Sequence, residues 1–168
     1  KPTVWTHSQG IFPLRVDLAK VLRMPESEVT VVHAEGAGCY GHNGADDVAL
    51  DAALLARAVP GSPVRVQWMR EDEFAWEPYG SPMVVAMEAA LDERGDIVSW
   101  KHELWSHGHS TRPGGKGGAN LLAGWHLERP VAAAKPGNPP LPAGGSHRNA
   151  IPLYEFPQQK IVNHLARE

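Results

Sequence analysis

The stretch HAEGAGCYGHNGADD, residues 33–47, joins a β-branched run, VTVV, to an apolar run with helical spacing. Its glycines Gly36, Gly38 and Gly41 match the G-x-G-x-x-G fingerprint of dinucleotide-binding Rossmann domains. In those domains the helix starts within the glycine motif, and an acidic residue follows about 20 residues later. Here the first candidate helix cap lies well beyond Gly41, and the next apolar run carries no carboxylate at its end. A Rossmann-type domain is therefore kept only as an alternative.

The same glycines offer a second kind of site. Because Gly36, Gly38 and Gly41 carry no side chain, a ligand can approach the main chain closely. Two or three converging N–H groups suit an anionic or oxo ligand. A tight turn with positive φ and no ligand would need the same glycines. The residues alone leave both interpretations open.

Hydrophobic spacing before and after the stretch predicts alternating strands and helices. A short strand is expected over residues 1–9, an amphipathic helix over 11–22 and a strand over 28–33. Asp46 or Asp47 would cap a second helix, because their carboxylates can accept free backbone N–H groups. The apolar side of that helix would be formed by Val48, Leu50, Leu54, Leu55 and Ala58.

The rest of the chain predicts mainly strands. An alternating run at residues 64–68 suits a half-buried strand. Longer runs at 83–91 and 97–106 suit an antiparallel hairpin, with DERGD as its turn. Residues 110–145 hold much glycine and proline and little periodicity, so an irregular loop is expected. One more strand is expected within 146–165.

These elements together predict an α+β fold: a mixed sheet with two helices packed on one face, a long hairpin and an irregular Gly/Pro-rich loop. Residues 1–168 are expected to form a single domain. The chain begins with Lys1 and closes on KIVNHLARE. Both ends predict that it is a fragment of a longer polypeptide.

Composition excludes several classes of function. A formal net charge of −3 provides no basic surface for nucleic acid. No apolar run approaches the roughly 18 to 20 residues that a membrane-spanning helix needs. The single cysteine, Cys39, can form neither an internal disulfide nor a C-x-x-C metal site. Within a glycine turn, it suits a small packed residue better than a metal ligand or a reactive thiol.

Two other clusters contain residue types that could form a site. His107 and His109 could place both rings on one side of a strand and bind zinc, but no third ligand is evident. Glu71, Asp72 and Glu73 could supply paired carboxylates, yet three adjacent acids on a turn are more often a solvated edge. We expect neither cluster to be a functional site.

Several segments, in this order and spacing, carry a resemblance to a known family. They are THSQG, VTVVHAEGAGCYGHNGADD, LLARAVPGSPVRVQWMREDEF, LDERGDIVSW and RNAIPLYEFP. The chain resembles the molybdenum-binding large subunit of the xanthine dehydrogenase and aldehyde oxidase family. The details GADD, MREDEF and RNAIPLYEFP are most similar to the isoquinoline 1-oxidoreductase and nicotinate dehydrogenase branch.

The resemblance implies part of a molybdopterin-binding domain in an oxidoreductase that hydroxylates aldehydes or N-heteroaromatic substrates with oxygen from water. The implied cofactor is molybdenum-molybdopterin, expected in the cytosine dinucleotide form and only in the full enzyme. Implied partners are the remainder of the large subunit, a [2Fe–2S] small subunit and, as a further candidate, a cytochrome c subunit. The bacterial cytoplasm and the periplasm both fit. The alternative is a non-catalytic interaction domain of the same fold.

The resemblance also implies which residues bind the cofactor. Gln9 matches a glutamine that hydrogen-bonds near the metal's oxo ligand, and Gly38, Cys39, Tyr40 and Gly41 match a turn whose amides face that ligand and the pterin. The family's catalytic glutamate, in a Gly-Val-Gly-Glu motif, has no match in this sequence. We therefore expect no catalytic residue here, and an inactive fragment.

Overall fold

The computed structural model resolves two compact units. The residues that it describes are 1–39, 45–108 and 112–166. Contacts divide them into a first unit, Lys1–Tyr79 with Thr111–Lys135, and a second unit, Gly80–Ser110 with Pro136–Glu168. The single-domain assignment of residues 1–168 stays a prediction.

The first unit begins with a parallel β-α-β arrangement. Strands β1 (Thr3–Thr6) and β2 (Thr30–His33) pair in parallel, and helix α1 (Ile11–Leu22) lies between them in sequence. These elements confirm the predicted order. The second strand begins at Thr30 and not at residue 28, because the short 3-10 helix η1 (Glu26–Glu28) precedes it. A left-handed residue, Arg23 with φ 55°, ends α1.

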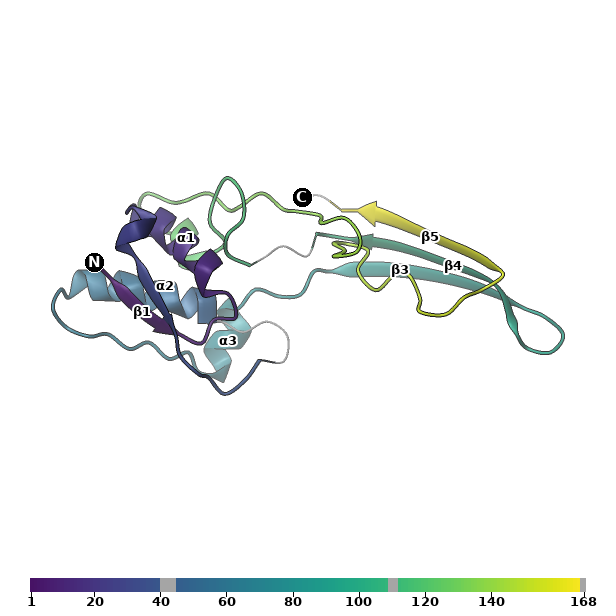
Figure 1. Ribbon diagram of the computed structural model, residues 1–168, viewed down its shortest axis with the longest axis horizontal. Helices are drawn as coiled ribbons and strands as arrows, with labels where there is room; N and C mark the ends of the chain where they lie inside the picture. Colours follow the sequence, from purple (N-terminus) through teal and green to yellow (C-terminus); the bar gives the residue numbers. More distant parts are fainter. Residues whose placement is uncertain (40–44, 109–111, 167–168) are drawn as a thin grey trace. The chain divides into compact units, whose positions relative to one another are not determined.

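Helix α2 (Ala45–Ala58) packs with α1 on one face of this small sheet (Figure 1). Val4 on β1 is buried beneath the helices, whereas its neighbour Trp5 points the other way and is 67% exposed. The buried side of α2 is lined by Ala45, Ala49, Leu50 and Ala53. The predicted apolar side is therefore wrong in part, because Leu55 is 52% exposed and small alanines permit the close helix contact.

The Gly/Pro-rich segment that follows residue 111 is irregular, as predicted, but it is firmly packed. Its residues Ala119 and Leu121 are fully buried in the core with α1 and α2. It also contains one short helix, α4 (Leu122–Trp125). A Cβ atom at Gly124 would lie 2.9 Å from a methyl group of Val21, so glycine permits α4 to approach α1.

Two local predictions between α2 and the second unit are wrong. Residues 64–68 alternate in exposure but pair with no strand in the described part of the chain. Alternation here reflects an extended segment lying on the unit, where Trp68 Nε1 donates to Asp51 of α2 at 3.0 Å. The acidic run expected on a turn instead forms helix α3 (Arg70–Trp76), where Asp72 accepts the Met69 N–H at 2.8 Å.

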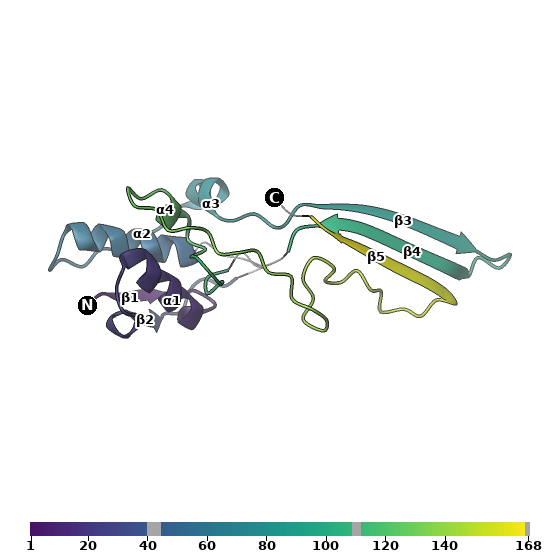
Figure 2. The same cartoon turned by 90° about the horizontal axis from the view of Figure 1, so that it is seen from above.

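The second unit contains a three-stranded mixed sheet (Figure 2). Strand β3 (Met83–Leu91) runs antiparallel to β4 (Ile97–Ser106), and β5 (Gln158–Leu165) pairs with β4 in parallel. The predicted hairpin, its turn and the last strand are confirmed. The α+β class is confirmed too, with one correction: helices α1 and α2 contact a separate, two-stranded parallel sheet formed by β1 and β2.

Among the described residues, none of the helices combines the length and apolar character that crossing a bilayer requires.

Candidate functional site

The two segments predicted to bind a cofactor leave the same edge of the β1–β2 sheet. β1 ends at Thr6 and β2 at His33, and these two residues are direct partners in the parallel register. The pairing continues past the strand ends, because the Ala34 N–H donates to the Thr6 carbonyl at 2.9 Å. Ligands of open α/β sheets commonly bind beyond the carboxyl ends of parallel strands. The THSQG segment and the glycine turn therefore start side by side at an edge suited to a ligand.

The glycine turn touches the segment that follows β1. A Cβ atom at Gly36 would lie 2.6 Å from Cγ of His7, closer than real Cβ contacts come, so only glycine fits. Gly38 has a φ of 112°, a conformation that other residues rarely adopt. Gly36 is thus required by its contact with the His7 side chain, and Gly38 by its backbone conformation. This requirement explains the glycine pattern without a nucleotide, and α2 begins at Ala45, after that motif.

The sequence-predicted site residues are placed as follows. Gln9 and Gly38 are exposed, and Cys39 is partly buried. Tyr40 and Gly41 lie outside the residues that the structure describes. Gln9 follows β1, and Gly38 and Cys39 follow β2, so the described members all come from the two strand ends. Their assignment to cofactor binding stays a prediction.

A buried carboxylate joins the Gln9 segment to α2. Asp46 is 1% exposed, and its Oδ1 accepts a hydrogen bond from the Ser8 hydroxyl. The Ser8 oxygen also accepts the Gly10 N–H at 3.1 Å, which fixes the bend before α1. Nη2 of Arg112 lies 3.2 Å from the second carboxylate oxygen, as an ion pair without hydrogen-bond alignment.

The predicted capping role is wrong in position. Asp46 and Asp47 both lie inside the first turn of α2, which begins at Ala45. Asp47 accepts the N–H of Leu122 at 2.7 Å, so it anchors α4. Negative side chains remain favourable in a first turn because of the helix dipole. Both side chains also accept hydrogen bonds from segments outside α2, and helix periodicity alone does not reveal these contacts.

Arg112 connects this carboxylate to the predicted cofactor residue Gln9. Its Nη1 donates to Gln9 Oε1 at 2.6 Å, while its Nη2 faces Asp46. The main chain of Arg112 is held as well, since its carbonyl accepts Asn120 Nδ2 at 3.1 Å. Sequence reasoning missed Arg112 and Ser8, because a contact across 103 positions leaves no local pattern.

The other candidate clusters gain no support. No group of three or more His, Cys, Asp or Glu side chains is arranged for a metal within residues 1–39, 45–108 and 112–166. His107 is partly buried, and His109 is outside those ranges. Glu71, Asp72 and Glu73 form the first turn of α3, at the surface.

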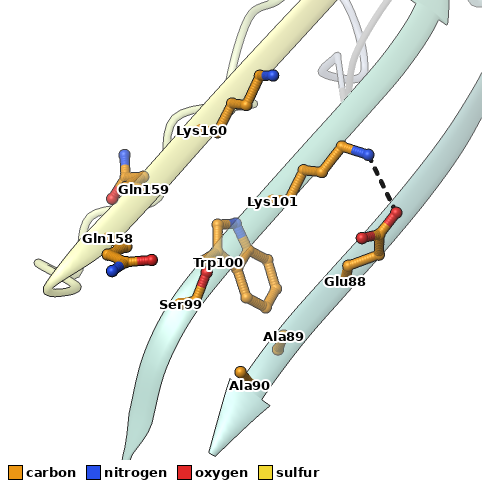
Figure 3. Close-up of a pocket in the computed structure, with 9 residues that line it drawn as sticks. All are labelled: Glu88, Ala89, Ala90, Ser99, Trp100, Lys101, Gln158, Gln159 and Lys160. Atoms are coloured by element: carbon orange, nitrogen blue, oxygen red, sulfur yellow. Dashed lines mark hydrogen bonds and ion pairs between the residues drawn. The ribbon is translucent and has the colours of Figure 1, made fainter.

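A cavity of about 380 Å³ lies on the second unit's sheet (Figure 3). Side chains from all three strands line it, among them Glu88, Trp100 and Lys160. Lys101 Nζ lies 3.0 Å from Glu88 Oε1, and this hydrogen bond raises the pKa of Lys101. A shallow surface with paired opposite charges is typical of a solvated sheet face. None of its lining residues belongs to β1, β2 or the segments that follow them.

Comparison with known proteins identifies one family model. Residues 1–124 match the model described as "Molybdopterin cofactor-binding domain". The match contains the β1–β2 edge, Gln9, the glycine turn and Arg112. No solved structure matches the chain significantly.

Curated relatives match parts of the chain. A nicotinate dehydrogenase subunit of Pseudomonas putida is 43% identical over 97 residues, 58% of this chain and 8% of that protein. The aldehyde oxidoreductase molybdenum-binding subunit PaoC of Escherichia coli is 34% identical over 116 residues, which cover 68% of this chain and 15% of that protein. A membrane-bound aldehyde dehydrogenase [pyrroloquinoline-quinone] of Gluconacetobacter polyoxogenes is 30% identical over 86 residues, covering 51% and 11%. The chain thus spans a small part of each relative.

Proposed function

This chain belongs to the molybdopterin cofactor-binding domain family, and on that premise we propose that it forms part of the cofactor site of a molybdenum-dependent oxidoreductase. The observation that carries the proposal is the shared edge. The segment bearing Gln9 and the turn bearing Gly38 and Cys39 leave adjacent parallel strands. In the proposal, an amide side chain and main-chain amides from these two segments would face the same ligand.

The described residues fit a group that presents oxygen atoms. Gly38 has positive φ and carries no Cβ atom, so no side chain of its own obstructs the main chain there. Fixed N–H donors stabilise an oxo group better than mobile charged side chains, because they need no rearrangement. In the proposal, Gln9 donates from its amide, and Gly38, Cys39, Tyr40 and Gly41 donate from the turn.

The proposed reaction is hydroxylation of an aldehyde or an N-heteroaromatic substrate with oxygen from water. Two relatives support this class, since their names are nicotinate dehydrogenase and aldehyde oxidoreductase. When bound, the molybdenum-pterin group would supply the two-electron oxidation. The residues of this chain would bind and orient that group, and they would exclude water from the face that they cover.

The remaining chemistry would come from outside these residues. No Gly-Val-Gly-Glu motif occurs in the sequence, so we propose that the catalytic glutamate belongs to a further segment of the large subunit. We propose that the pterin is in the cytosine dinucleotide form. The proposed partner proteins are a [2Fe–2S] small subunit and a cytochrome c subunit. The 168-residue chain by itself is expected to be inactive.

A quinone is the competing cofactor class. One relative's name contains pyrroloquinoline quinone, and it is 30% identical to this chain over 86 residues. A quinone also presents oxygen atoms and would suit amide donors. The family model and the relative named as a molybdenum-binding subunit favour molybdenum.

The deciding experiment is cofactor analysis of the full-length protein, purified after expression with the pterin and molybdenum supply intact. We expect one molybdenum and one pterin per large subunit and no quinone. Quinone without molybdenum would contradict the proposal and favour the competing class. Absence of both would favour a non-catalytic interaction domain. Incorporation of heavy oxygen from labelled water into the product would then test the reaction type.

A further inference from the structure

We propose that Arg112 is a positioning residue for Gln9, which it orients so that the amide's N–H groups, and not its oxygen, face the cofactor. This inference rests on the proposed function of the β1–β2 edge. It concerns a residue 103 positions away from Gln9.

The chemistry of the contact fixes the direction of the amide. A guanidinium has only donors, so the Gln9 atom that meets Arg112 Nη1 at 2.6 Å must be the oxygen, Oε1. The Nε2 group then turns away from Arg112, and none of the described residues accepts its protons. An amide held this way can only donate at its open end. Donation is what an oxygen ligand requires.

Arg112 is itself held at both ends. Its side chain is 33% exposed, and Nη2 lies 3.2 Å from the buried carboxylate of Asp46. Its carbonyl accepts Asn120 Nδ2 at 3.1 Å, and the Asn120 N–H donates to the fully buried Asp17 at 2.9 Å. The guanidinium therefore has little freedom to release Gln9. A side chain fixed by packing and by a second layer of hydrogen bonds gives the precise geometry that functional groups need.

The positive charge has a second effect on the amide. A hydrogen bond from a guanidinium to Oε1 polarises the amide and strengthens donation from Nε2, because linked hydrogen bonds reinforce one another. The Asp46 carboxylate balances that charge, so the pair adds little net field at the edge. Lysine would retain the charge, but its single ammonium group lacks the planar fork that reaches two acceptors at once.

A double-mutant cycle in the full-length, cofactor-loaded enzyme tests the proposal. The variants are Gln9→Ala, Arg112→Met and the two combined, each normalised to its molybdenum content. A lost hydrogen bond to a charged group predicts a decrease in turnover of about tenfold for each single variant. If Arg112 acts through Gln9, turnover of the combined variant is about tenfold below that of the unmodified enzyme, as in each single variant. A loss of about a hundredfold is not expected, because the two changes remove one interaction.

Spectroscopy provides a readout that does not depend on turnover. The electron paramagnetic resonance signal of the partly reduced molybdenum is expected to change in the same way in all three variants. Arg112→Lys is expected to resemble Arg112→Met, and it carries the test if the methionine variant does not accumulate. Arg15→Met is the matched control, since Arg15 also pairs with a carboxylate, Glu26, but at the exposed surface. Its turnover and signal should equal those of the unmodified enzyme.

The outcomes separate the inference from the function on which it rests. Losses that multiply in the combined variant, or an unchanged signal in Arg112→Met, overturn the positioning role while stoichiometric molybdenum keeps the proposed function. Full rescue by lysine also overturns it, because charge alone would then suffice. An unmodified protein that binds no molybdenum overturns the proposed function, and the inference fails with it.

Discussion

Ser8 and Asp46 lie 38 positions apart in the sequence, yet the Ser8 hydroxyl donates directly to the Asp46 carboxylate inside the first unit. Both side chains are almost fully buried. The hydrogen bond joins the bend before α1 to the first turn of α2, and so fixes the two helix starts beside the candidate cofactor edge.

Replacement of Ser8 by alanine is expected to destabilise the first unit. It leaves one oxygen of the buried Asp46 carboxylate without its hydroxyl donor. Such a loss costs about 1–3 kcal/mol of unfolding free energy. Urea denaturation followed by circular dichroism would measure it. Ser27→Ala, at an exposed position in η1, should change the unfolding free energy by less than about 0.5 kcal/mol. Equal effects of the two variants would refute the role given to the hydrogen bond.

A methyl group at Gly36 is expected to disrupt the edge. In Gly36→Ala, the new Cβ atom would lie 2.6 Å from Cγ and 2.7 Å from Cβ of His7. Overpacking of this kind costs about 1–3 kcal/mol, which thermal unfolding would report. His7→Gly should recover most of the loss in the double variant, because it removes both contact atoms. Gly80→Ala is the control, since nothing lies within 4 Å of its Cβ position.

Lys20 is expected to be the anchor of the irregular segment. Its Nζ donates to the fully buried Asp17 at 2.8 Å and to the carbonyls of Gly115 and Gly118 at 3.1 and 2.6 Å. Lys20→Met leaves Asp17 without its cation and should cost about 3 kcal/mol, the lower end for a broken buried pair because Lys20 is partly exposed.

Hydrogen exchange gives a local test of the same anchor. Amides of residues 115–120 should exchange faster in Lys20→Met than in the unmodified chain. Lys1→Met provides the comparison, because Lys1 forms a 4.0 Å exposed pair with Glu28. Surface pairs contribute about 0–1 kcal/mol. Unchanged exchange in Lys20→Met would show that the segment packs without the lysine.

Two aspartates predict opposite effects of pH on stability. Burial raises the pKa of Asp51, and the hydrogen bond from Trp68 only partly offsets this shift. The folded chain then binds the proton more tightly than the unfolded chain does. Stability therefore falls as pH rises from the ordinary value of about 3.9 through the raised pKa. Asp51→Asn removes this penalty, keeps an acceptor for Trp68, and should be at least as stable as the unmodified chain at pH 7.

Asp92 provides the reverse case. Backbone N–H groups of Asp96 and Arg94 lower the pKa of Asp92 in the turn between β3 and β4. Its stabilising effect is present above the ordinary value of about 3.9 and is lost as pH falls through the lowered pKa. Asp92→Asn should therefore lose stability at pH 7, and the deficit should shrink in acid. Unfolding curves between about pH 3 and 7 would check both signs, and parallel profiles of the two variants would contradict the assignment.

Local periodicity was enough to predict helix α1 and the β3–β4 hairpin, but not helix α3. The apolar stripe of residues 11–22, with Leu14 and Leu18, gave the bounds of α1, and alternation over 83–106 gave the hairpin. The same rule failed at Val64 and Val66, because alternating exposure also arises in an extended segment without a strand partner. It failed for Leu55 because the buried side of α2 is formed by Ala45, Ala49, Leu50 and Ala53, and Leu55 lies outside that side.

The sequence by itself determined the class, the family and the residues that leave the strand ends. Gln9 and Gly38 could be singled out because a motif is written in consecutive residues, and the family match covers residues 1–124. Only the tertiary structure decided that Arg112 contacts both Gln9 and Asp46, and that Asp46 accepts a hydrogen bond from Ser8. These hydrogen bonds join residues that are separated by 38 and by 103 positions in the sequence. They depend on how helices and loops pack, and neither propensity nor spacing along the chain specifies that packing.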